Sequence, residues 1–156
     1  MATLDAFVPH SVRLGPNQVT FLLSAAATGG VLSLTEFAAA PPPAPAAPIH
    51  RHLDADETLY ILEGNFEFVI GERREPAPTG ASIFIPRGTP HTIENVGPGI
   101  GRMLVILTPP GFEQYWTERA QYVTDHGRPE DEAALLALQE KYHMDTGGRV
   151  RGFAQQ

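Results

Sequence analysis

The stretch HRHLDADETLYILEG, residues 50–64, places two histidines, a glutamate and a glycine at fixed spacing: His50, His52, Glu57 and Gly64. Side chains at positions i and i+2 of a strand point to the same face, so the rings of His50 and His52 can reach one ion from inside a barrel. Glu57 follows a short bend after this strand and adds a carboxylate. The stretch therefore predicts a metal site on a β-strand.

A second stretch, GASIFIPRGTPHTIEN at residues 80–95, adds a third imidazole, His91, from a strand that closes across the first. Three nitrogens and one oxygen suit a divalent transition metal such as Fe, Mn, Ni, Co, Cu or Zn. An octahedral ion would keep two open positions, which indicates chemistry rather than a purely structural role. We predict one such ion, held by His50, His52, Glu57 and His91. Glu57 is also the predicted catalytic base, and whether it binds the ion or only accepts a proton stays open.

The composition indicates one domain. The chain has 156 residues, 42% of them apolar, enough for a single core. Cysteine is absent, which excludes thiolate ligands and a cysteine nucleophile, and the net charge of −7 without a basic cluster argues against a nucleic-acid partner. The sequence shows neither an apolar run of membrane-helix length nor a signal-peptide pattern at its start, so we expect a cytoplasmic protein without a membrane partner.

Short apolar segments between glycines and prolines predict strands, and a helical period follows them. The predicted strands are residues 19–23, 31–37, 58–62, 66–70, 82–85, 91–96 and 102–107. A hairpin is predicted around Gly64, and a polar loop over residues 71–80. The proline-rich segment 41–48 should be a surface loop that borders the metal site. One helix is predicted from Gly111 onward, and a second from Pro129 to a stop at Gly147-Gly148.

These elements predict an all-β jelly-roll barrel with a C-terminal α-helical extension. The whole chain, residues 1–156, is expected to be one domain, with a barrel core at about 15–109 and a helical tail at about 110–146. The helices could shape access to the metal or simply cover the outer wall of the barrel. Strands 58–62 and 102–107 carry apolar residues on both faces, which predicts that a partner, most simply a second copy in a homodimer, or the helices cover the outer face.

The two stretches resemble the two motifs of the cupin superfamily, G-x5-H-x-H-x4-E-x6-G and G-x5-P-x-G-x2-H-x3-N. Nine of the ten prescribed positions agree, and the exception is Ala44, which stands where the first glycine is expected. Four further matching positions are expected to be turn residues: Gly64, Gly80, Pro86 and Gly88. Asn95 is expected to brace the fold. His10, His126 and His143 match neither motif and are expected to be solvated or hydrogen-bonded.

The tail segment 110–116 and the end at 140–144 look like small bacterial cupins related to quercetin 2,3-dioxygenase. That resemblance implies a metal-dependent dioxygenase acting on a hydroxylated aromatic or enolic small molecule. The same metal and base would also serve a non-oxidative cupin, such as an isomerase, cyclase or decarboxylase, and a third alternative is a small-molecule-binding cupin without turnover. The resemblance also implies a homodimer.

Overall fold

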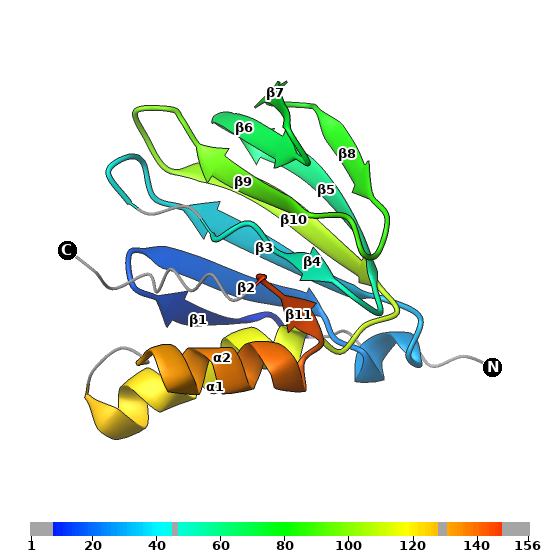
Figure 1. Ribbon diagram of the computed structural model, residues 1–156, viewed down its shortest axis with the longest axis vertical. Helices are drawn as coiled ribbons and strands as arrows, with labels where there is room; N and C mark the ends of the chain where they lie inside the picture. Colours follow the sequence, from blue (N-terminus) through cyan, green and yellow to red (C-terminus); the bar gives the residue numbers. More distant parts are fainter. Residues whose placement is uncertain (1–7, 45–46, 128–130, 148–156) are drawn as a thin grey trace.

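The computed structural model describes residues 8–44, 47–127 and 131–147 (Figure 1). Strands come first and helices follow. The strands before the helices are β1 His10–Leu14, β2 Asn17–Leu23, β3 Ser33–Ala39, β4 Arg51–His52, β5 Asp56–Glu63, β6 Asn65–Ile70, β7 Arg73–Pro78, β8 Ser82–Ile85, β9 His91–Asn95 and β10 Gly101–Thr108, with a 3-10 turn at Ala26–Thr28. The remaining elements are α1 Glu113–His126, α2 Glu132–Lys141 and β11 Met144–Asp145.

Two main antiparallel sheets form the barrel. One has six strands in the order β1-β2-β3-β10-β5-β8, and the other has three in the order β7-β6-β9; β4 pairs with β11. The core lies between the sheets and includes Leu59, Ile61, Phe66 and Phe68, each at most 2% exposed. The all-β jelly roll with C-terminal helices is thereby confirmed.

The predicted hairpin around Gly64 is wrong. Strands β5 and β6 exist, but β5 pairs with β10 and β8 while β6 pairs with β7 and β9, so the chain passes from one sheet to the other at Gly64. Gly64 has a φ of 94°, and a Cβ there would lie 2.9 Å from the Cα of Gly101. Glycine is needed because the two segments approach too closely for a side chain.

The predicted polar loop at residues 71–80 is also wrong in part, because β7 occupies most of it. Proline cannot donate a ladder hydrogen bond and is tolerated only at a sheet edge. Strand β7 is such an edge, pairing with β6 alone, so its Pro76 and Pro78 are accommodated. The alternation of apolar and polar residues that predicts a strand is absent from β7, because the strand is mostly exposed and contains two prolines.

The two predicted helices of the tail are present, and the bounds of the second differ from the prediction. Helix α2 starts at Glu132, and the predicted start at Pro129 lies outside the described residues. The backbone of Asp131 is extended, and its side chain caps the helix by accepting a hydrogen bond from the Ala134 N–H. The helix ends at Lys141, before Gly147, and strand β11 follows. Within the described part of the chain, no helix is long and apolar enough to cross a membrane.

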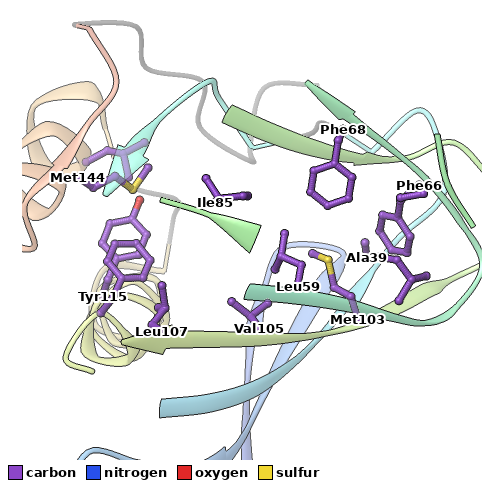
Figure 2. Close-up of a cluster of buried hydrophobic side chains, with 14 residues drawn as sticks. Ala39, Leu59, Phe66, Phe68, Ile85, Met103, Val105, Leu107, Tyr115 and Met144 are labelled. Carbon is purple, nitrogen blue, oxygen red and sulfur yellow. The ribbon is translucent and has the colours of Figure 1, made fainter. Parts of the chain in front are cut away.

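Both helices pack against the barrel interior rather than over its broad outer wall. Phe112, Tyr115, Leu135 and Met144 belong to the buried core cluster. Figure 2 shows Tyr115 and Met144 at one end of this cluster, beside the helices, with Phe66 and Ala39 at the other. The helical tail therefore closes one end of the core.

The outer face of the six-stranded sheet carries exposed apolar side chains. Leu104 on β10 pairs with Tyr60 on β5, and Ile106 pairs with Thr58, which in turn pairs with Phe84 on β8. Tyr60 is 41% exposed and Phe84 is 62% exposed, so the helices leave this face open. The homodimer stays a prediction, and this face is where we propose that a second copy docks.

We expect a dimer mass for the wild-type protein in multi-angle light scattering at micromolar concentration. Phe84→Glu should shift that mass toward a monomer, because each copy would bury a carboxylate against an apolar face. Val31→Glu is the matched control, since Val31 is also 62% exposed but lies in a bend before β3 rather than on a strand of the sheet. A monomer mass for the wild type would contradict the prediction.

Candidate metal centre

Three separate backbone segments bring the four predicted ligands together. His50 and His91 form an antiparallel bridge, in which the His50 N–H donates to the His91 carbonyl at 2.9 Å and the His91 N–H donates back at 2.8 Å. His52 lies on β4 and Glu57 on β5. The predicted closure of the His91 strand across the first histidine strand is confirmed.

The donor atoms fit the coordination shell of one ion. One ligand atom from each of His50, His52, Glu57 and His91 lies within 4.8 Å of the other three. Two ligands that each bind an ion at about 2.1 Å are at most about 4.2 Å apart, so a shift of a few tenths of an ångström completes the shell. The residues therefore form a group suited to a divalent metal, and their role as its ligands stays a prediction.

Backbone carbonyls orient two of the rings. The Nδ1 of His50 lies 2.8 Å from the Pro48 carbonyl oxygen, and the Nδ1 of His91 lies 2.8 Å from the Thr89 carbonyl oxygen. A carbonyl only accepts hydrogen bonds, so each Nδ1 carries a proton and donates. This fixes the ring orientation and presents Nε2 to the group, as in metal sites generally.

Glu57 is the centre of the group. Its Oε2 lies 2.9 Å from Nε2 of His91 and 3.3 Å from Nε2 of His52, and its side chain is almost fully buried. Burial alone would raise the pKa of Glu57, but the hydrogen bonds from His52 and His91 outweigh burial and hold that pKa well below its usual range. The carboxylate is therefore anionic at neutral pH.

The pKa values of His50 and His91 shift in opposite directions. Burial, together with the neighbouring His91 and His52, lowers the pKa of His50 to about 3, so this ring is neutral and its lone pair is available to a metal. Burial opposes a charge on His91 as well, but the adjacent Glu57 more than offsets it and raises the pKa of His91. A proton and a metal ion therefore compete for the Nε2 of His91.

A loop before His91 braces the site from outside. The Arg87 backbone N–H and guanidinium donate to Asp56, the neighbour of Glu57, and the Gly88 N–H donates to the His52 carbonyl at 2.7 Å. Gly88 has a φ of 76°, so its predicted turn role is confirmed. The sequence offered no signal for the Arg87–Asp56 contact, which joins residues 31 positions apart.

Asn95 braces the fold, as predicted. Its Nδ2 donates to the carbonyls of Ala39 and Gly99, and its Oδ1 accepts from the Gly97 N–H. The amide nitrogen and oxygen of Asn95 thus both have hydrogen-bond partners in the backbone.

The remaining histidines stay outside the group. His10 stacks on Phe21, His126 stacks on Tyr122, and His143 contacts Asp54.

A cavity of about 100 Å³ adjoins the metal group, with His50 and Glu57 on its wall. Its apolar wall comes from both sheets and from α1 with the residue before it, and the larger side chains are Phe37, Phe66, Ile93, Met103, Phe112, Tyr115 and Trp116. Ala44, Ala47 and Pro48 also line it, so the predicted border role of the proline-rich loop is confirmed for its described residues. The wall is mostly apolar, which suits an apolar ligand body.

The tail contributes residues that the sequence did not assign to the site. The Phe112 ring lies 4.4 Å from the His52 ring, and Met144 on β11 pairs with His52 on β4. Of the two roles predicted for the helices, the structure favours access to the metal group over a coat on the outer wall. An apolar stripe along a helix predicts that the helix packs against another element, but it does not identify that element.

Comparison with known proteins gives the following likenesses. Residues 37–107 match the family model described as the cupin domain. The uncharacterized protein MJ1618 of Methanocaldococcus jannaschii is 36% identical over 62 residues, which are 40% of this chain and 50% of that protein. This chain thus spans about half the length of the curated relative that it matches.

Two solved structures share the fold. KdgF from a Halomonas species matches with a TM-score of 0.59 and 15% identity, over 67% of this chain and 90% of that one. The polyketide cyclase RemF from Streptomyces resistomycificus matches with a TM-score of 0.54 and 25% identity, over 69% of this chain and 79% of that one.

We expect the purified protein to contain about one transition-metal ion per chain, measured by inductively coupled plasma mass spectrometry. The double variant His50→Ala/His91→Ala should lose this metal, because two of three nitrogen donors are removed. His126→Ala is the control, since His126 is exposed and outside the group. Full metal content in the folded double variant would rule out this ligand set.

Proposed function

We propose that the chain is a metal-dependent enzyme of the cupin superfamily, since residues 37–107 match the family model described as the cupin domain. The observation that carries the proposal is the convergence of His50, His52, Glu57 and His91 beside a mostly apolar cavity. A purely structural site would have no need of a cavity at its ligands.

In this proposal, His50, His52, Glu57 and His91 would hold one divalent transition metal, which would supply Lewis-acid activation of a substrate oxygen. Glu57 would accept the proton of the substrate hydroxyl, because its carboxylate is anionic and lies on the cavity wall within the ligand group. The Nε2 atoms of His52 and His91, which lie 3.3 and 2.9 Å from the Oε2 of Glu57, would bind the ion instead of this carboxylate. The apolar side chains of Phe66 and Met103 hold the body of the substrate and keep water away.

For the reaction, we propose a dioxygenase that acts on a hydroxylated aromatic or enolic small molecule. Such a substrate offers the acidic hydroxyl that Glu57 can deprotonate and a flat apolar body for the aromatic wall of the cavity. Loss of that proton makes the ring or enol electron-rich, which is the condition for reaction with dioxygen and cleavage of a C–C bond.

A non-oxidative reaction is the second candidate, and the likeness to a polyketide cyclase at 25% identity favours it. Cyclisation of an enolisable compound would use the same deprotonation by Glu57 and the same metal, without dioxygen. A small-molecule-binding cupin without turnover is the third alternative.

Oxygen uptake separates these candidates. We expect metal-loaded protein, incubated with a panel of hydroxylated aromatic and enolic compounds, to consume dioxygen in an oxygen electrode and to place ¹⁸O from labelled dioxygen into a product. A product formed without oxygen uptake would replace the dioxygenase by the non-oxidative enzyme. Binding of these compounds without any product would leave only the binding protein.

Glu57→Gln should lower kcat by about 10²-fold or more, because it removes the base. Most of the metal should remain, since three histidines still bind it. Glu94→Gln is the matched control, because Glu94 also lines the cavity but lies outside the ligand group, and its kcat should change little. Wild-type kcat in Glu57→Gln would contradict the role of Glu57 as base.

A further inference from the structure

The cavity beside the metal group is small and lies below the protein surface. Its volume is about 100 Å³, whereas pockets for drug-sized ligands usually measure about 300–1,000 Å³. Every described residue on its wall is buried or half-buried, so a bound molecule must fit largely inside this space. An engineered apolar cavity of about 150 Å³ in another protein binds one benzene ring. The space available here is therefore that of one ring at most.

Packing keeps the aromatic part of the wall in place. The Phe66 ring rests on the backbone of Gly101, because a Cβ at Gly101 would lie 2.5 Å from the Phe66 Cζ. The centroid of the Phe112 ring lies 4.4 Å from that of His52 and 4.7 Å from that of Tyr115, on which it stacks. Rings that are packed this closely cannot retreat to make room for a larger ligand without displacing their neighbours.

Two neighbouring inward side chains of β10 also belong to the wall. Met103 and Val105 are two positions apart on one face of the strand, and each is 4% exposed. Met103 is the longer of the two, and its unbranched side chain fills the space that the packed rings leave. A shorter side chain at either position would enlarge the cavity without removing a ring.

We infer that the substrate is a phenol with a single ring or a short enol, and that Met103 and Val105 set this upper limit of size. Compounds with two or more fused rings are excluded, because they exceed the space that the wall encloses. This inference rests on the proposed function, since it assumes that the substrate hydroxyl lies at His50 and Glu57. An ion held there would take up part of the same space and lower the limit further.

Such a limit works against the ordinary trend of apolar binding. Burial of apolar surface stabilises a complex, so a larger ring system normally binds more tightly to an apolar wall. Overfilling a packed interior forces side chains out of their preferred rotamers and offsets this gain. A small ligand that binds more tightly than its larger homologue would therefore identify the limit.

The test uses phenol and 2-naphthol, which carry the same hydroxyl on one ring and on two. In calorimetric titrations of the full-length, metal-loaded protein at millimolar probe concentration, we expect phenol to bind at least about tenfold more tightly than 2-naphthol. Met103→Ala should abolish this preference, because the shortened side chain makes room for the second ring. Val105→Ala should reduce the preference to a smaller extent.

Val19→Ala is the matched control for Val105→Ala. Val19 is also a buried valine, at 0% exposed, but it belongs to the core cluster around Phe21 and is not among the described residues that line the cavity. This variant should lower the melting temperature and keep the wild-type ratio of the two affinities. A general loosening of the core is thereby distinguished from a larger cavity.

Equal or tighter binding of 2-naphthol by the wild type, undetectable binding of phenol, or an unchanged preference in the folded variants at Met103 and Val105 would each overturn the inference. If Met103→Ala does not fold, Val105→Ala alone decides between these outcomes. Metal analysis of the same samples separates the two failures, because a metal-free wild type contradicts the proposed function, whereas a metal-loaded protein without the preference contradicts only the size limit.

Discussion

A buried carboxylate joins the two sheets of this protein. Glu57 on the six-stranded sheet contacts His91 on the three-stranded sheet, and the backbone bridge between His50 and His91 holds a further histidine against the same point. A buried charge is costly unless it is paired and hydrogen-bonded, so these groups must keep their places together. The geometry that suits a metal ion is thus the same geometry that closes the barrel at this position.

The helical tail depends on that closure and completes it. Its first residue at the site, Phe112, lies against His52, and its last strand, β11, pairs with the strand that carries His52. The Glu118 carboxylate on α1 accepts hydrogen bonds from Lys141 and Tyr142 at the end of α2, which ties the two helices together. The walls of the cavity and the strand that carries His52 are therefore one packed unit.

This arrangement makes the cavity chemically asymmetric. His50 and Glu57 stand at one place on the wall, and aromatic side chains line the space beside them. A ligand with a polar group at His50 and Glu57 and an apolar body gains from both parts, whereas a small apolar molecule gains only from the rings. Selectivity in such a site comes from the polar groups, because apolar contacts alone discriminate weakly between ligands of similar shape.

The sequence by itself determined which four residues meet in the candidate metal group, the turn glycines and most strands. These depend largely on local spacing, because His50 and His52 share a face through the period of a strand and Gly88 serves a local turn. Only the tertiary structure decided that β5 and β6 lie in different sheets, that β7 forms an edge despite its prolines, and that Arg119 lines the cavity. Periodicity shows which side of an element is apolar, but not which element covers it. That choice depends on how segments far apart in the chain pack together, and no local pattern encodes it.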